Sequence, residues 1–189
     1  MRKSAGSALT TLAVLAIVVG AAWALVSSQL TGPPDGTVSS QEARPADIGA
    51  AIAVPDSALG MTVAHVHDGD TLFLTTSTGT ELKVRLIGVD TPELQPAAEC
   101  YALEARDHLR QLAPDGSTVR VVADAESQDQ YGRSLFYLWT EAGEFVNLRL
   151  VADGFGTALN VEPNSAFWGE LVDAERSAQE SGAGLWSGC

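Results

Sequence analysis

Basic residues are scarce in this chain of 189 residues, in which 11 Lys and Arg stand against 24 Asp and Glu. The net charge of −13 repels a polyphosphate on average, so composition alone argues against a nucleic-acid partner. Cysteine is also scarce, and no cysteine stands directly after the apolar run near the N-terminus, which excludes a lipid-modified N-terminal cysteine. No internal repeat is present. Hydrophobic residues at 46% and charged residues at 19% indicate a globular chain, with room for one ordinary domain and its appendages.

Charge is missing between Lys3 and Asp35, and within this stretch Ala8 to Val26 is nearly all apolar. A run of this length is long enough for a membrane-spanning helix, and the preceding basic pair predicts that the N-terminus stays inside. We therefore expect residues 1–26 to be a signal-anchor with the rest of the chain outside the cytoplasm. Cleavage after Ala24 as a signal peptide, giving a secreted protein, is the open alternative.

Two further segments follow. Residues 27–60 contain several Pro, Gly and Ser residues and predict a flexible linker, and residues 61–189 form the predicted domain. Its two cysteines, Cys100 and Cys189, are expected to form a disulfide if the chain is exported, and to remain free thiols if it is cytosolic. A monomer is expected.

The domain predicts five short strands with a helix between the third and the fourth, followed by two more helices. Alternation of apolar residues in Glu81–Ile87 places Arg85 on the face opposite Leu82, Val84 and Leu86. The order indicates a five-stranded OB-fold barrel with about three helices. The predicted strands are Met61–His67, Thr71–Thr76, Glu81–Ile87, Ser117–Val122 and Ser134–Trp139, and the predicted helices are Glu99–Leu112, Phe145–Asp153 and Ser165–Glu180, with Ser165 as N-cap.

Three short segments combine carboxylates with arginines. They are His67-Asp68-Gly69-Asp70-Thr71, the run from Arg85 to Glu93, and Tyr131-Gly132-Arg133. Carboxylates on turns at strand ends offer the hard oxygen ligands that calcium prefers. A planar guanidinium matches phosphate oxygens in bidentate fashion. Alone, each segment is more often an ordinary turn or a surface group; together they indicate phosphoryl chemistry.

In order and spacing these segments resemble the thermonuclease family, the staphylococcal nuclease-like domains, from about Val63 to Trp186. The resemblance rests on DGDT, R-L-x-G-V-D-T-P-E, Y-G-R-S-L-x-Y, the Val146-Asn147 pair with Gly154, and G-L-W near the end. It implies an OB-fold barrel that uses calcium to hydrolyse DNA and RNA to 3′-phosphate products.

The resemblance also implies roles for individual residues. Asp70, Asp90 and the carbonyl of Thr91 match the calcium ligands, and Glu93 matches the general base. Arg85 and Arg133 match the phosphate-binding pair. Asp68 and Asp129 are further candidates: they would contact and orient these groups without binding the metal or the phosphate themselves.

Two departures from the family pattern are visible. The segment between Glu93 and Glu99 is a few residues shorter, and Leu159-Asn160-Val161 stands where tyrosines flank the bound base. Weaker base stacking is expected there. Two alternatives to a nuclease stay open: a non-catalytic OB module that binds nucleic acid or peptide, and an anchored calcium-binding structural domain. The first predicts lost carboxylates or arginines, and the second leaves Arg85 and Arg133 unexplained.

Overall fold

The structure, a computed structural model, describes residues 52–189. The predicted signal-anchor 1–26 and the first part of the predicted linker lie outside these residues. Within residues 52–189 no helix has both the length and the apolar character needed to cross a bilayer.

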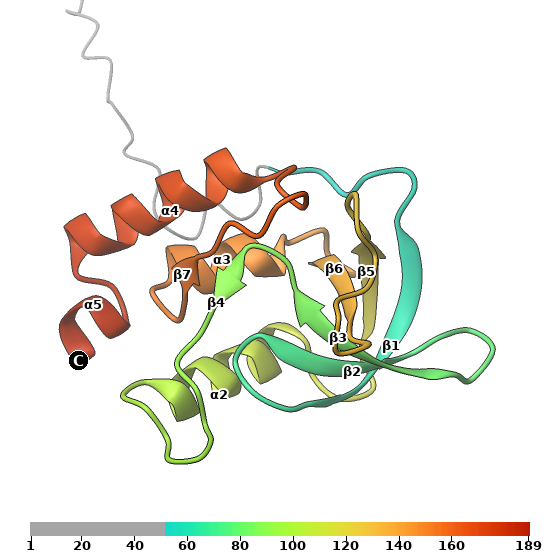
Figure 1. Ribbon diagram of the computed structural model, residues 1–189, viewed down its shortest axis with the longest axis horizontal. Helices are drawn as coiled ribbons and strands as arrows, with labels where there is room; N and C mark the ends of the chain where they lie inside the picture. Colours follow the sequence, from blue (N-terminus) through green and yellow to red (C-terminus); the bar gives the residue numbers. More distant parts are fainter. Residues whose placement is uncertain (1–51) are drawn as a thin grey trace, which may run out of the picture. The chain divides into compact units, whose positions relative to one another are not determined.

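Five strands close into a barrel (Figure 1). Around the barrel the order is β1-β2-β3-β6-β5; β3 and β6 run parallel and the other neighbours antiparallel. The helix α2 follows the third barrel strand along the chain, so the predicted five-stranded barrel with an inserted helix is confirmed. The strands are β1 Leu59–Val66, β2 Thr71–Thr75, β3 Glu81–Leu86, β5 Thr118–Val122 and β6 Ser134–Thr140.

Helices pack beside the barrel, and three of them correspond to the predicted helices: α2 Ala102–Leu112, α3 Val146–Ala152 and α4 Trp168–Ser181. The predicted N-cap of the last helix is wrong: α4 is capped by Phe167 without a side-chain bond, and Ser165 offers only its carbonyl, to Trp168 N–H at 3.1 Å. The sequence missed the two-residue strands β4 Val89–Asp90 and β7 Thr157–Ala158, which pair antiparallel, and the short helix α5 Leu185–Gly188.

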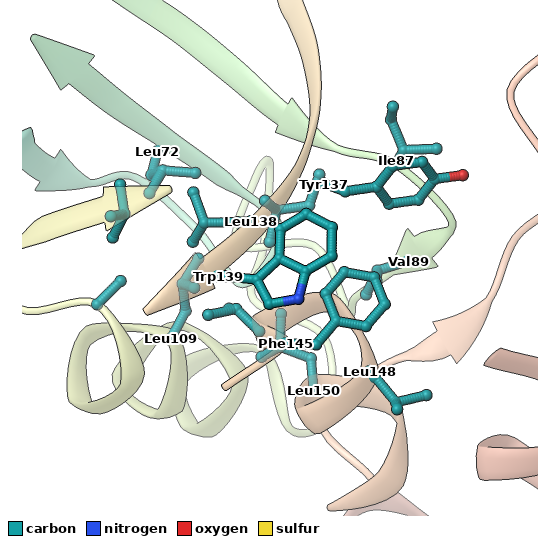
Figure 2. Packing of buried hydrophobic residues seen from close by; sticks show 14 of the residues in the cluster. Leu72, Ile87, Val89, Leu109, Tyr137, Leu138, Trp139, Phe145, Leu148 and Leu150 are labelled. Carbon is teal, nitrogen blue, oxygen red and sulfur yellow. The ribbon is translucent and has the colours of Figure 1, made fainter. Parts of the chain in front are cut away.

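Aromatic side chains from β6 and from the segments beside it fill one end of the core (Figure 2). The rings of Trp139 and Phe145 stack with centroids 4.5 Å apart, and both are fully buried. The Trp139 Nε1–H donates to the carbonyl of Ile52 at 3.1 Å, and Ile52 and Val54 pack against this core. The packed domain therefore begins before Met61, where the sequence placed its boundary.

Alternation along β3 sets the direction of its arginine. Val84 and Leu86 are fully buried in the barrel, whereas Lys83 is exposed and the Arg85 side chain lies on the opposite face from the core. This agrees with the predicted face and brings Arg85 out at the end of the strand, beside β4.

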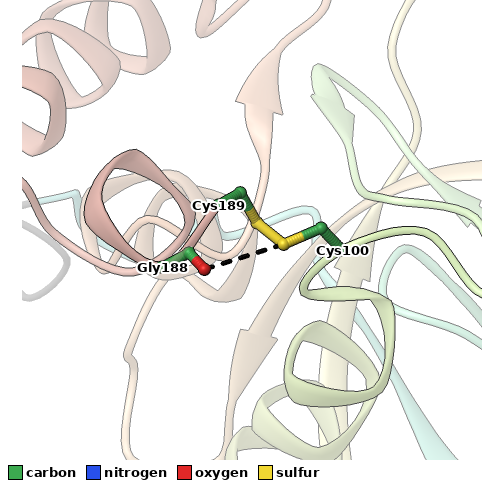
Figure 3. Close-up of a disulfide and its surroundings, with 3 residues drawn as sticks. All are labelled: Cys100, Gly188 and Cys189. Carbon is green, nitrogen blue, oxygen red and sulfur yellow. Dashed lines mark hydrogen bonds between the residues drawn. A yellow bond between two sulfur atoms is a disulfide. The ribbon is translucent and has the colours of Figure 1, made fainter.

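The two cysteines are joined (Figure 3). The Cα atoms of Cys100 and Cys189 are 5.9 Å apart, and the predicted disulfide is confirmed. The Cys100 Sγ also lies 3.7 Å from the Gly188 carbonyl, but a bonded sulfur has no proton to donate, so this is a packing contact. The bond links the segment just before α2 to the end of α5.

Candidate active site

The tight turn between β1 and β2 carries the first acidic side chain. An Asp68 carboxylate oxygen accepts the N–H groups of Asp70 at 3.1 Å and Thr71 at 2.7 Å, which closes the turn. Glycine is required at position 69, because a Cβ there would stand 2.6 Å from the Thr91 hydroxyl and 2.8 Å from the Ala105 Cβ. The turn is thereby pressed against the segment after β4 and against α2.

Asp70 is buried with 4% of its surface exposed, yet both carboxylate oxygens have donors. The Thr71 hydroxyl donates to Oδ1 at 3.1 Å. Oδ2 accepts the backbone N–H and the hydroxyl of Thr91, each at 3.0 Å. Thr91 was predicted to act through its carbonyl; the structure shows in addition that its N–H and hydroxyl fix the Asp70 carboxylate.

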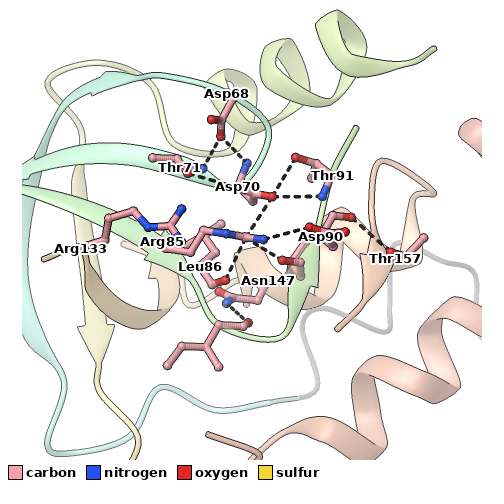
Figure 4. Close-up of polar contacts among 12 residues, drawn as sticks. Asp68, Asp70, Thr71, Arg85, Leu86, Asp90, Thr91, Arg133, Asn147 and Thr157 are labelled. Carbon is pink, nitrogen blue, oxygen red and sulfur yellow. Dashed lines mark hydrogen bonds and ion pairs between the residues drawn. The ribbon is translucent and has the colours of Figure 1, made fainter. Parts of the chain in front are cut away.

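Arg85 draws two carboxylates together (Figure 4). Its Nη1 lies 3.0 Å from Asp70 Oδ2, and its Nη2 lies 3.1 Å from Asp90 Oδ1. The same Nη1 donates to the Val89 carbonyl at 2.6 Å, so the guanidinium is held against β4. One cation therefore sets the separation of the two predicted metal ligands.

The two carboxylates differ in solvent exposure. The Asp90 side chain is 53% exposed, and its backbone is fixed by pairing with Thr157 of β7. The pKa of Asp70 is raised to about 6, chiefly because the carboxylate is buried; Arg85 and the Thr91 donors lower it, and the charge of Asp68 adds to the increase. The negative charge of Asp70 is thus incompletely compensated by the groups around it.

Arg133 reaches the same region from the start of β6. Its Nε donates to Asp129 Oδ2 at 2.7 Å, and Asp129 Oδ1 accepts the backbone N–H groups of Tyr131 and Arg133. Burial would raise the pKa of Asp129, but the bonds from Arg133 outweigh it and hold this pKa below its usual range. Within residues 52–189 no acceptor is found for the two terminal nitrogens of Arg133, so its fork remains available to a ligand.

Both arginines line one pocket of about 360 Å³. Leu159 and Val161, which stand where the family pattern has tyrosines, form an aliphatic side of it. The pocket also contains Asp129 but not Asp70, Asp90 or Glu93. The phosphate-binding candidates therefore face an open space, and the metal candidates lie behind Arg85.

Glu93 is exposed and lies on the segment between β4 and α2. Its N–H donates to a Glu99 carboxylate oxygen at 2.9 Å, and its carbonyl accepts the Glu99 N–H at 2.8 Å. Among residues 52–189 no hydrogen bond or ion pair joins the Glu93 side chain to Asp70, Asp90 or either arginine. The structure thus joins Asp70, Asp90 and Arg85, and holds Glu93 separately.

The donor atoms fit an oxygen-ligated cation. Asp70 and Asp90 both contact the Arg85 guanidinium, the Asp70 charge is incompletely compensated, and the Thr91 carbonyl belongs to the residue that fixes Asp70. No cluster of three or more His, Cys, Asp or Glu side chains suited to a metal occurs in residues 52–189. The set therefore fits a hard cation that completes its shell with carbonyl and water oxygens.

Sequence reasoning gave two contributors no role in this site, although Asn147 was among the residues that carry the resemblance. Glu99 fixes the backbone of Glu93, and buried Asn147 accepts from Leu138 N–H at 2.9 Å and donates to the Ile87 carbonyl at 2.8 Å. Asn147 thereby ties α3 to β6 and to the turn that leads to Asp90. The signal for Asn147 was a polar residue among the apolar residues of α3; Glu99 gave none, because its bond is made to backbone.

A sequence model described as staphylococcal nuclease homologue matches residues 83–188, a span that contains Arg85, Asp90, Thr91, Glu93 and Arg133. A thermonuclease of Staphylococcus intermedius is 33% identical over 131 residues, which are 66% of this chain and 74% of the relative. A thermonuclease of Staphylococcus hyicus is 33% identical over 128 residues, with the same two shares. Endonuclease YhcR of Bacillus subtilis (strain 168) is 30% identical over 135 residues, which are 66% of this chain and 11% of that protein. The barrel, the arrangement around Arg85 and these matches lead to one conclusion: the chain belongs to the staphylococcal nuclease homologue family.

Proposed function

We propose that this chain is an exported, calcium-dependent nuclease that hydrolyses phosphodiester bonds in DNA, RNA or both. Family membership and the thermonuclease and endonuclease relatives make it a nuclease; calcium and export are the proposed parts. The observation that carries the proposal is that Asp70 and Asp90 meet at Arg85 while Arg85 and Arg133 line one pocket.

Each group has a task that its surroundings support. The terminal nitrogens of Arg133 bind phosphate oxygens while Asp129 holds the Nε end in place. Arg85 adds fixed positive charge beside the same pocket. Asp70, Asp90 and the Thr91 carbonyl would hold calcium, which supplies charge that stabilises the phosphoryl oxygens and orients water. Glu93, exposed on its segment, accepts the proton of the attacking water.

The net charge of the chain does not oppose this chemistry. From Met61 onward there are 8 Lys and Arg against 20 Asp and Glu, a net of −12. Catalysis needs positive potential only where phosphate binds, and there two guanidinium groups face one pocket. The remaining acidic surface weakens nonspecific binding and favours solubility.

One assay on the purified full-length chain tests both hydrolysis and its metal requirement. Cleavage of DNA and RNA is expected with millimolar calcium and is expected to stop with chelator. Glu93→Gln should lower turnover by about 10²-fold or more while substrate binding persists. Glu180→Gln, at an exposed position in the last turn of α4, is the matched control and should leave turnover unchanged.

The outcomes separate the alternatives. A chain that binds oligonucleotides but cleaves neither DNA nor RNA is the non-catalytic OB module. Calcium binding without either property identifies the structural domain. Near-normal turnover in Glu93→Gln means that another group is the base.

Export rests on the basic pair and the apolar run in residues 1–26. Protease added outside intact cells should degrade the domain, and a domain protected until the cells are lysed would contradict export. N-terminal sequencing of the mature protein distinguishes an uncleaved anchor from cleavage after Ala24.

A further inference from the structure

Three neighbouring strands present one cross-strand row on the outside of the barrel. His65 of β1 is paired in register with Phe73 of β2, and Phe73 with Lys83 of β3. The rings of His65 and Phe73 are stacked, with centroids 4.3 Å apart and planes 14° apart. On the other side, the Lys83 Nζ lies 6.0 Å from the centre of the Phe73 ring. These three residues are called the β1–β3 row below.

The row is open to solvent. His65 and Lys83 are exposed and Phe73 is half-buried, while the residues that alternate with them, such as Val66 and Leu72, are buried in the barrel. β1, β2 and β3 lie side by side in Figure 1. The row therefore offers a ring stack together with a cation on an exposed sheet face.

Lys83 is unusual among the cations of this acidic domain. Six of the eight Lys and Arg residues after Met61 are within 4.0 Å of a carboxylate. In residues 52–189 only Lys83 and Arg120 have no carboxylate at that distance. Lys83 lies on the strand of Arg85, whereas Arg120 is an exposed residue of β5, on the other side of β1.

The row adjoins the active site. Lys83 and Arg85 are two residues apart on β3, so their side chains share a face and their Cα atoms are roughly 7 Å apart. In the opposite direction the same face of β3 continues to Glu81, whose negative charge repels phosphate. The face therefore has room for only one or two nucleotides beyond the phosphate at Arg85.

We propose that the β1–β3 row is a subsite for an unpaired nucleotide next to the bond that is cut. Its base stacks on the face of Phe73 that His65 leaves uncovered, and the Lys83 side chain, which now lies over that face, moves to bind the phosphate of the same nucleotide. Stacking on aromatic side chains needs an exposed base face, so the occupant is a single-stranded segment of the substrate. This inference rests on the proposed function, because it assigns the phosphate-binding role to Arg85.

Direct binding tests the subsite independently of catalysis. The full-length chain is titrated into a fluorescein-labelled oligothymidylate of about 12 nucleotides, with chelator to prevent cleavage, and fluorescence anisotropy gives Kd at several salt concentrations. Lys83→Gln should weaken binding at low salt and make the slope of log Kd against log salt shallower by about 0.7. Phe73→Leu should raise Kd about tenfold without changing that slope.

Arg120→Gln is the matched control, because it removes another exposed cation without a carboxylate partner, from a strand outside the row. Its Kd should stay within about twofold of the unmodified chain. Equal effects of Lys83→Gln and Arg120→Gln, no effect of either row variant, or no oligonucleotide binding by the unmodified chain would overturn the proposal. Lys83 is exposed, so its variant tests the subsite even if Phe73→Leu unfolds. If binding depends on the row but nothing is cleaved, the proposed function fails and the subsite stands.

Discussion

Asp70 is the residue at which burial and the proposed metal site meet. Its pKa is raised to about 6, so the folded state holds this proton more tightly than the unfolded state, whose value is 3.8. Between these two values the unfolded chain ionises first. Asp70 therefore contributes fully to the free energy of unfolding below about pH 4. This contribution, roughly 3 kcal/mol, is lost as the pH rises through 6.

Asp70→Asn should reveal that cost in the metal-free chain. The difference in unfolding free energy between variant and unmodified chain should shift by about 2–3 kcal/mol toward the variant between pH 4 and pH 7. Denaturant unfolding in chelator measures it. Calcium should reverse the order at pH 7 by stabilising only the unmodified chain, and its affinity should fall as pH drops below 6. A difference that does not change with pH would mean that Asp70 titrates normally.

Arg133 is divided between two tasks, since Nε binds Asp129 and the terminal nitrogens face the pocket. Arg133→Lys should lower kcat/KM by about 10²-fold or more, because one ammonium cannot replace the planar fork. Asp129→Ala should cost less, and the double variant should cost no more than the Arg133 change alone, since Asp129 acts through Arg133. Additive losses in kcat/KM would show that Asp129 has a separate role.

At the residue level, sequence predicted the groups whose position follows from a local rule. Alternation along β3 placed Arg85 outside the barrel, and the Asp-Gly-Asp turn placed Asp70 between two strands. The same rules do not reach Thr91, whose N–H and hydroxyl bind Asp70 from 21 residues away. Such contacts depend on how the strands close, which no local pattern records.

Among the structural elements, the segment between β4 and α2 carries Glu93, the proposed general base. It is held by the two bonds between Glu93 and Glu99, and Glu99 adjoins the disulfide at Cys100. Glu99 is therefore a positioning residue for Glu93. Its carboxylate fixes the Glu93 backbone while the Glu93 side chain stays exposed to solvent.

Glu99→Ala should lower kcat several-fold to tenfold with little change in KM, because the backbone of Glu93 loses a hydrogen bond while the two arginines proposed to bind phosphate are unchanged. Glu99→Gln should recover most of the loss, because an amide oxygen can still accept the Glu93 N–H. Steady-state kinetics on one oligonucleotide decide it. A rise in KM alone, or failure of Glu99→Gln to recover activity, would contradict the positioning role.

The barrel strands were predictable because each has several residues of alternating or β-favouring character. β4 and β7 were not, because two residues carry no period; they form because the Gly88 turn and the chain after α3 come together. This small pair matters to the site, since it fixes the backbone of Asp90. The site therefore depends on an element that only tertiary structure defines.

Across the whole molecule, some basic side chains join structural elements through ion pairs and others lie at or beside the pocket. Arg149 joins Glu144 and Asp153, and Asp153 also contacts His108 of α2, so this group connects the helices rather than the site. Arg85 and Arg133 line the pocket, and Lys83 belongs to the adjoining β1–β3 row. An acidic protein can thus bind a polyanion because most of its arginines pair with its own carboxylates and two of these, Arg85 and Arg133, also line the pocket.

The disulfide closes the molecule on itself, joining residues 89 apart. In the chain-entropy model a loop of this length contributes about 4–5 kcal/mol, chiefly by restricting the unfolded chain, and measured gains are often smaller. The native packing around the bond is tight, because the Tyr101 ring lies where a Cβ at Gly188 would stand. Loss of the disulfide therefore affects both the unfolded ensemble and the packing of α5.

Cys100→Ser with Cys189→Ser should lower the unfolding free energy by about 2–5 kcal/mol, measured by denaturant unfolding in chelator at pH 7. Each single variant should lose nearly as much as the double, because either change removes the bond. The unmodified chain, denatured without reductant, should show no titratable thiol, and two thiols would mean that the bond does not form. Since Cys100 follows Glu99, the double variant should also lose kcat more than affinity for substrate, as Glu99→Ala does. A double variant with unchanged kcat but reduced stability would show that the disulfide only stabilises the fold and that Glu99 alone holds the segment of the proposed general base.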